Sequence, residues 1–168
     1  MIYKAPVRIR RNVESFGDPY LNEESLEENT VCTMCGSIYT QGRWYTKSQL
    51  PDAKAPAGEP HKVKCPACRK QRDGVPGGVL TISGDFFWKH EEEIMNLIRN
   101  QAADALGINP LERVMSLETV GSDVELKTTN EALAQRIGKA LHKAYSGHVE
   151  YKWSHDTKLA RVTWFRQD

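Results

Sequence analysis

Apolar residues recur at helical spacing in two segments of the second half of the chain. In the segment at about 85–106 they recur three and four residues apart, so they share one face of a predicted helix. The residues on this face are Ile94, Leu97, Ile98, Ala102, Ala105 and Leu106. Gly107 and Pro110 then supply a stop signal. A second helix is predicted in "NEALAQRIGKALHKAY", where the apolar positions again share one face.

Strands are predicted on both sides of this second helix. The stretch "RVMSLETVGSDVELKTT" is typical of two strands joined by a Gly-Ser turn. Apolar and polar residues alternate in "HVEYKWS" and again in "LARVTWFR", which predicts a second pair of strands. With the helix they form a ββαββ module at about 112–166. We therefore expect an α+β fold in which this module is an antiparallel sheet with a helix on one face.

The first half of the chain lacks such periodicity. Residues 1–29 have no periodic apolar positions and are charged in blocks, so we interpret them as a flexible charged arm. Residues 30–78 form a cysteine module that contains a hairpin-like stretch, "SIYTQGRWYTK", and a proline-rich loop, "LPDAKAPAGEP". The glycine-rich segment "DGVPGG" marks its end. The expected organisation is an arm, the cysteine module and an α+β domain at 79–168.

Four cysteines in two C-x2-C pairs predict a metal site. The pairs are Cys32 with Cys35 and Cys65 with Cys68. Two such turns supply the four thiolates of a tetrahedral zinc ion, and the hairpin and the proline-rich loop absorb the long separation between them. We therefore predict a zinc ribbon that holds one Zn2+. Four cysteines leave no open position for water, so the zinc is expected to be structural.

Other interpretations of these residues stay open. His61 lies close to Cys65 and could replace one thiolate, although a surface position is favoured for it. Cys32 and Cys35 could instead form the redox pair of a thiol oxidoreductase or take part in disulfides. The chain has no P-loop, GxGxxG, GxSxG or HExxH motif, and its histidines are scattered. No residue is indicated as a catalyst, so we expect a protein that is not an enzyme.

The net charge of +1 conceals a strong segregation of charge. Residues 1–11 carry +4 and residues 18–28 carry −5, whereas 43–72 hold eight basic and two acidic residues, a net +6. Cations attract phosphates, and an exposed aromatic ring can stack on an unpaired base. The predicted RNA contacts are Arg43, Trp44, Tyr45, Lys47, Lys62, Lys64, Arg69, Lys70 and Arg72.

Two of these features have a second interpretation. Trp44 and Tyr45 could shield the zinc, because so small a module needs apolar cover. For Trp44 the shielding interpretation is as well founded as base stacking. The acidic block at 18–28 could fold over the basic ribbon as an RNA mimic, although a solvated tail is favoured.

The overall composition is typical of a globular protein in water. Hydrophobic residues make up 39% of the chain and charged residues 27%. No apolar run approaches the roughly 18 to 20 residues that span a bilayer, and the N-terminal segment does not resemble a secretory signal. We therefore expect a cytoplasmic protein that has reduced thiols and no membrane partner.

Several segments resemble a known family. The pairs "CTMCG" and "CPACRK", the stretch "ERVMSLETVGSDVELKTTNEALAQRIGKALHKAYSG" and the closing "ARVTWF" are similar to the nonsense-mediated mRNA decay protein three family, of which the chain looks like a small bacterial relative. The resemblance spans about residues 30–166. It implies zinc ribbons that bind the ribosomal large subunit or its RNA, and no catalysis. Cys32, Cys35, Cys65 and Cys68 match the metal positions.

These observations together predict a zinc-binding protein that associates with RNA, most naturally ribosomal RNA or the large subunit. The ββαββ module would orient the ribbon or bind a second protein. The main alternative is an adaptor between proteins, in which the zinc ribbon only holds a hairpin for its partner.

Overall fold

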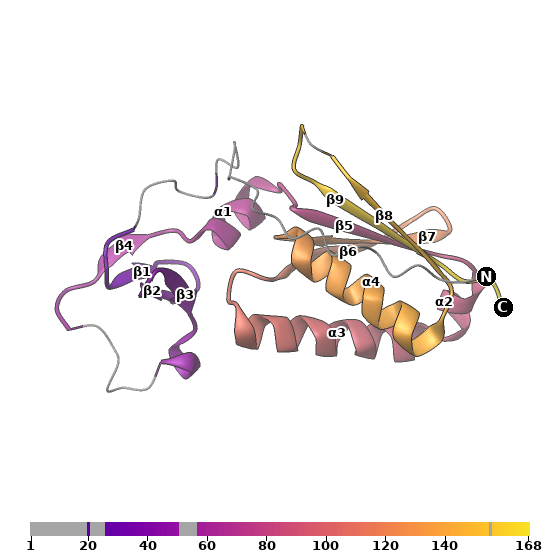
Figure 1. Cartoon of the computed structure of the whole chain (residues 1–168), viewed down its shortest axis with the longest axis horizontal. Helices are drawn as coiled ribbons and strands as arrows, with labels where there is room; N and C mark the ends of the chain where they lie inside the picture. Colours follow the sequence, from indigo (N-terminus) through magenta and orange to yellow (C-terminus); the bar gives the residue numbers. More distant parts are fainter. Residues whose placement is uncertain (1–19, 21–25, 51–56, 155) are drawn as a thin grey trace.

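The computed structural model describes residue 20 and residues 26–50, 57–154 and 156–168 of the chain. Figure 1 shows two halves side by side, a small one that holds the cysteines and a larger one built on a long sheet. Both contain helices and strands, which confirms the α+β class. Most of the predicted arm at 1–29 lies outside the described residues.

A four-stranded sheet forms the smaller half, which we call the cysteine module (residues 26–50 and 57–77). Its strands are β1 (Thr30–Cys32), β2 (Ile38–Thr40), β3 (Arg43–Tyr45) and β4 (His61–Val63), in the order β3-β2-β1-β4. The first three are antiparallel neighbours, and β4 lies parallel to β1. Gln41 and Gly42 join β2 to β3 with positive φ angles of 51° and 79°, as a tight hairpin requires. The predicted hairpin is therefore confirmed.

Two short helices complete the cysteine module. The 3-10 helix η1 (Lys47–Gln49) follows β3, and α1 (Pro66–Asp73) follows β4. Pro66 occupies the first position of α1, where its missing N–H costs no hydrogen bond. Gly74 ends the helix in the left-handed conformation at φ 67°. In Figure 1, α1 lies between the small sheet and the larger half.

The larger half, which we call the α+β domain (residues 78–168), contains a five-stranded sheet. Its strands are β5 (Gly78–Ser83), β6 (Val114–Val120), β7 (Asp123–Thr128), β8 (His148–Trp153) and β9 (Ala160–Phe165), in the order β6-β7-β5-β9-β8. The hairpins β6–β7 and β8–β9 are those predicted from the sequence. They do not pair with each other, however, because β5 lies between them.

The prediction of an antiparallel sheet is therefore wrong, because the sheet is mixed. Strand β5 runs antiparallel to β7 and parallel to β9. Its residues Val79, Leu80 and Ile82 are all buried. A buried central strand shows a short continuous apolar run with little alternation, so it carries a weak signal in the sequence.

Three helices belong to the α+β domain: α2 (Asp85–Lys89), α3 (Glu91–Ile108) and α4 (Glu131–Tyr145). The helix predicted at 85–106 is thus two helices that meet at His90, and the second includes Gly107. Asn130 caps α4 by accepting a hydrogen bond from the Leu133 amide at 3.1 Å. Helices α3 and α4 lie on the same side of the sheet (Figure 1).

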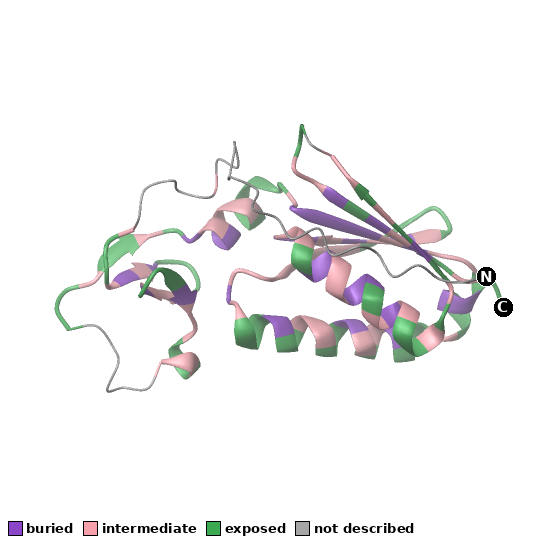
Figure 2. Ribbon diagram, viewed as in Figure 1, coloured by how far each residue is buried: buried purple, intermediate pink, exposed green. Residues whose placement is uncertain are grey.

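The main core lies between this sheet and its helices. It combines Leu80, Leu126, Val162 and Trp164 from the strands with side chains of all three helices, and Figure 2 shows the buried residues along their facing surfaces. Helix α4 approaches β9 closely, since a Cβ added at Gly138 would lie 2.7 Å from Val162 Cγ1. No helix in the described ranges has the length and apolar character needed to cross a membrane.

Candidate metal centre

The structure brings the predicted cysteine ligands together. The Sγ atoms of Cys32, Cys35, Cys65 and Cys68 all lie within 4.8 Å of one another, and those of Cys35 and Cys65 are 3.8 Å apart. A tetrahedral ion with metal–sulfur bonds of about 2.3 Å separates its ligand sulfurs by roughly 3.8 Å. The four thiols therefore fit a single metal ion.

The parallel pairing of β1 and β4 places the two C-x2-C turns face to face. Cys32 ends β1 opposite Val63 of β4, and Cys65 follows β4 as the N-cap of α1. The Cys65 amide donates to Cys32 Sγ at 3.2 Å, and the Cys68 amide donates to Cys65 Sγ at 3.4 Å. These amides hold the sulfurs in place, and they favour the thiolate form.

Arg113 contacts the cysteine cluster, and the sequence did not predict this. It comes from the α+β domain, just before β6. Its guanidinium donates to Cys35 Sγ at 3.1 Å and to Cys68 Sγ at 3.2 Å, and its Nε donates to the Pro110 carbonyl at 2.7 Å. Burial alone would lower the Arg113 pKa, but its hydrogen bonds with Cys35 and Cys68 raise it. A fixed positive charge therefore lies against the sulfurs.

The thiols differ in how readily they ionise. Burial would raise the pKa of Cys35, but hydrogen bonds with Ser37 and Arg113 outweigh it and lower the pKa to about 6. Burial raises the pKa of both Cys65 and Cys68. Without a cation among them, four thiolates this close would repel one another. A bound metal ion removes this conflict and stabilises all four as thiolates.

Apolar side chains cover the cysteines from one side. Trp44 is 6% exposed and belongs to a cluster with Cys32, Cys65, Ala67 and Cys68. Tyr39 meets Trp44 edge to face, with ring centroids 5.5 Å apart. This placement favours the shielding interpretation of Trp44 over base stacking.

Three of the predicted RNA-binding lysines are free to bind a ligand. Lys47, Lys62 and Lys64 are exposed, and within the described ranges of the chain they make no hydrogen bond or ion pair. They lie on one module, because Lys62 is in β4 and Lys64 directly follows it. Such side chains can approach phosphates without breaking an internal contact.

The other predicted cations have partners inside the protein. Arg43 donates to the Ile108 carbonyl at 2.9 Å, and Lys70 donates to that of Thr129 at 3.2 Å, so both join the two halves. The Arg43 guanidinium also lies 4.7 Å from the centroid of the half-buried Tyr45 ring. Arg72 pairs with Asp73 at 2.6 Å.

His61 lies away from the sulfur cluster. Its Nε2 is 2.6 Å from a carboxylate oxygen of Glu27, and both side chains are exposed. The group of residues that could hold a metal ion contains the four cysteines and not His61. The predicted surface position of His61 is therefore confirmed.

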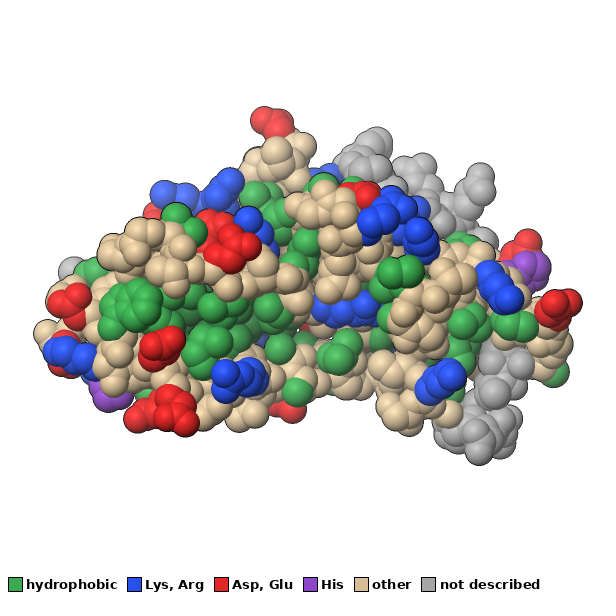
Figure 3. All heavy atoms as spheres, turned by 180° about the vertical axis from the view of Figure 1, so that it is seen from behind, with side chains coloured by type: hydrophobic (Ala, Val, Ile, Leu, Met, Phe, Trp, Pro, Cys, Tyr) green, Lys and Arg blue, Asp and Glu red, His purple; other side chains and the backbone are tan. Residues whose placement is uncertain are grey.

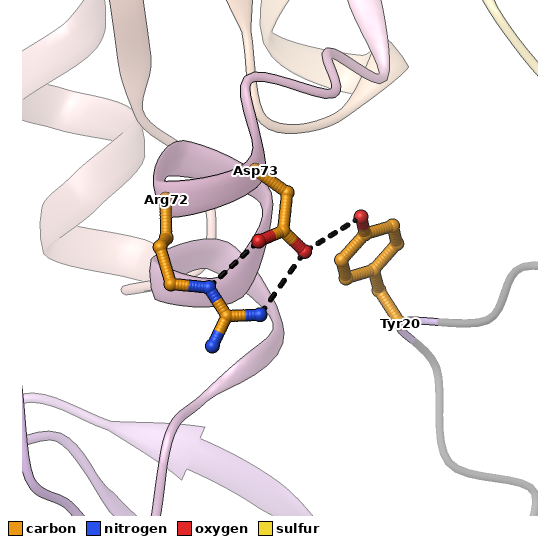
Figure 4. Close-up of polar contacts among 3 residues, drawn as sticks. All are labelled: Tyr20, Arg72 and Asp73. Atoms are coloured by element: carbon orange, nitrogen blue, oxygen red, sulfur yellow. Dashed lines mark hydrogen bonds and ion pairs between the residues drawn. The ribbon is translucent and has the colours of Figure 1, made fainter.

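Part of the acidic block at 18–28 contacts the cysteine module. Glu28 accepts from Thr40 Oγ1 at 2.6 Å, and Leu26 packs against the cluster around Trp44. Tyr20 lies beside α1, where its hydroxyl donates to Asp73 at 2.9 Å (Figure 4). The remaining residues of the block, 18, 19 and 21–25, are outside the described residues. The choice between an RNA mimic and a solvated tail for the whole block therefore stays a prediction.

Comparisons with protein-family models, curated proteins and solved structures found no match to this chain. The family resemblance therefore stays a prediction. The metal centre is supported by its own geometry.

Proposed function

We propose that the four cysteines bind one structural zinc ion and that the module around it binds RNA, specifically ribosomal RNA of the large subunit. The observation that carries this proposal is the convergence of four sulfurs within 4.8 Å of one another, with those of Cys35 and Cys65 at the 3.8 Å spacing of a tetrahedral ion. The zinc would fix the strands and α1 that present the basic side chains. The protein would act by binding and not by catalysis.

Zinc is favoured by the ligand set. Four thiolates select zinc or iron, and a closed all-cysteine site is typical of zinc that stabilises a small module. Bound zinc with four thiolates has a net charge of −2, and Arg113 would offset half of it through its hydrogen bonds to Cys35 and Cys68. Such outer partners orient metal ligands and strengthen binding.

The charge of the module supports RNA as the ligand. Residues 43–72 carry a net +6, and Lys47, Lys62 and Lys64 are exposed. Binding to a polyanion releases counterions in proportion to the phosphates contacted, so the affinity should fall steeply as salt rises. Trp44 is left out of this surface because it is buried.

Co-sedimentation with ribosomes and isolated subunits tests the proposal. Zinc-loaded full-length protein, with its metal content measured, should sediment with the large subunit at low salt and be released as salt increases. The variants Lys47→Glu and Lys62→Glu should weaken this association. Lys143→Glu, which reverses the charge of an exposed residue on α4, should not. No association at low salt, with one zinc per chain, would contradict the RNA proposal.

An adaptor between proteins is the second candidate. It is favoured by apolar side chains that are exposed on the α+β domain: Trp88 at 44%, Val120 at 54% and Phe165 at 45%. Such an adaptor would bind its partner with little dependence on salt and would tolerate charge reversal at Lys62.

If the protein were instead a thiol oxidoreductase, Cys35 should react with an alkylating reagent while the metal is still bound.

A further inference from the structure

A cavity lies where the two halves meet. It has a volume of about 800 Å³, and its walls come from the β2–β3 hairpin, the junction of β4 and α1, the loop that follows α3, and the residues Tyr20 and Leu26 before β1. Figure 3 shows Lys and Arg side chains beside hydrophobic ones at this junction. Its volume lies in the range of sites that enclose a small ligand or part of a larger one.

The walls combine apolar side chains with positive charge. Tyr39, Trp44 and Leu111 supply apolar surface, while Arg43, Lys64 and Arg69 supply three cations. Glu112 is the one acidic side chain among the described lining residues. This combination suits a ligand that has a planar ring and a negative charge.

We propose that this cavity takes one unstacked nucleotide of single-stranded RNA, with its base against Tyr39 and its phosphate on Lys64. The proposal rests on the proposed function and deepens it, because it names the part of the RNA that is recognised. Proteins that read single strands combine aromatic stacking with cations along the backbone. The cavity places both kinds of group within one site.

Contacts made by the lining cations support this assignment. Lys64 is exposed and makes no hydrogen bond or ion pair in the described ranges. Its ammonium group can therefore pair with a phosphate without breaking an internal contact. Arg69 is already engaged by Tyr20, another lining residue, because its guanidinium donates to the Tyr20 carbonyl at 2.7 Å and lies 5.4 Å from the centroid of the Tyr20 ring. The phosphate is therefore assigned to Lys64 and not to Arg69.

Trp44 provides a built-in probe of the cavity. The chain has four tryptophans. Trp44 borders the cavity, whereas Trp88, Trp153 and Trp164 lie in the α+β domain. In zinc-loaded protein labelled with 5-fluorotryptophan, a single-stranded oligouridylate of about twelve residues should shift the fluorine NMR signal of Trp44. The signals of Trp88 and Trp164 should not move, and Trp44→Phe assigns the shifted line.

A matched pair of variants separates the cavity from the surrounding charge. Lys64→Glu and Lys62→Glu reverse the same charge two residues apart, and both side chains are exposed. Lys64 lines the cavity, and Lys62 does not. Both variants should weaken binding of the oligouridylate, but only Lys64→Glu should abolish the Trp44 shift. An oligomer of abasic residues keeps the phosphates, so it should bind roughly 5- to 150-fold more weakly, the range expected for one stacked base.

The outcomes distinguish this proposal from the proposed function. Salt-sensitive RNA binding with a silent Trp44 signal, and equal affinity for the abasic oligomer, would overturn the nucleotide site and leave RNA binding intact. No binding to RNA at low salt would overturn both proposals. A Trp44 shift that saturates together with RNA binding, and that Lys62→Glu preserves, supports the site.

Discussion

The two halves of the chain bury different kinds of residue. The α+β domain has a continuous apolar core drawn from three helices and several strands of its sheet. In the cysteine module the buried cluster contains the apolar side chains Trp44 and Ala67, and its remaining fully buried members are cysteines. Modules of this size rarely bury enough apolar surface to fold alone, and a bound metal ion can take the place of the missing core. We therefore expect one half to depend on hydrophobic burial and the other on metal coordination.

The halves are nevertheless joined by polar contacts. Arg43 and Lys70 of the cysteine module donate to carbonyl groups of Ile108 and Thr129. Arg113 of the α+β domain donates to Cys35 and Cys68 of the cysteine module. Both halves therefore contribute contacts to the candidate metal centre, although its four cysteines all come from the cysteine module.

Removal of the metal should produce the largest difference between the halves. Chelation withdraws a coordination free energy on the order of 10 kcal/mol. The cysteine module should unfold, while the α+β domain keeps its core. Hydrogen exchange measured by mass spectrometry checks this, because peptides from 30–45 and 61–73 should lose protection while peptides from 114–128 should not. Equal loss of protection in both halves would contradict the separation.

A cavity in the apolar core should have the reverse effect. Leu80 is fully buried in the central strand β5, so Leu80→Ala should lower the free energy of unfolding of the α+β domain by about 2–5 kcal/mol. The zinc content should stay at one per chain. Urea unfolding, with elemental analysis of the folded protein, measures both quantities.

The control for this variant is Val120→Ala. Val120 is 54% exposed, so its truncation should change the free energy of unfolding by no more than about 0.5 kcal/mol. Loss of zinc from the Leu80→Ala protein would show that the core and the metal centre are not independently stabilised.

What the sequence could predict follows from how local each signal is. The cysteine pairs, the β2–β3 hairpin and helix α4 carry spacing or periodicity within a few residues, and the structure contains all of them. Strand β5 was missed because its partners β7 and β9 lie far along the chain. Its six residues show neither clear alternation nor helical spacing.

Arg113 was missed for a related reason. Its approach to Cys35 and Cys68 results from the packing of the two halves, and no motif around residue 113 records that packing. The sequence also left open whether Trp44 is buried or exposed, because an aromatic residue beside basic ones suits either a stacking surface or a core. Its burial against the cysteines depends on β1, β4 and α1 together.

Loss of Arg113 should have an intermediate effect. Arg113→Met removes the short hydrogen bonds to Cys35 and Cys68 and the longer one to Cys65, and it leaves the thiolate charge without its partner. The affinity for zinc should fall by about 10- to 100-fold, as for other groups that support metal ligands. Competition with a chromophoric chelator measures this change. Arg113→Lys should recover part of the affinity, because lysine restores the charge without the two-pronged geometry.

The matched control for Arg113 is Arg99→Met. Arg99 is exposed on α3, where its guanidinium donates to Asn96 at 2.8 Å and, among the described residues, to no sulfur. Its loss should leave zinc affinity unchanged. An equal weakening in both variants would mean that Arg113 acts through general charge and not through its hydrogen bonds.

The smallest effect is expected from Tyr20→Phe, which tests whether the segment before the cysteine module is held on α1. The pKa of Asp73 lies below its usual range because of hydrogen bonds with Arg72 and then with Tyr20. A carboxyl group whose pKa is lowered on folding adds stability above its ordinary pKa and loses it as the pH falls through the lowered value. Removing the Tyr20 hydroxyl should therefore raise the Asp73 pKa.

Carbon-13 NMR of the Asp73 side-chain carboxyl, titrated in acid, measures this shift. Asp123→Asn in the α+β domain is a suitable control, since it changes charge without touching α1. The unfolding transition should not change measurably, because Tyr20 and Asp73 are both solvent-accessible and such pairs contribute little. An unchanged Asp73 pKa in the Tyr20→Phe protein would mean that the contact in Figure 4 is not maintained in solution, and that the neighbouring arginines lower this pKa without Tyr20.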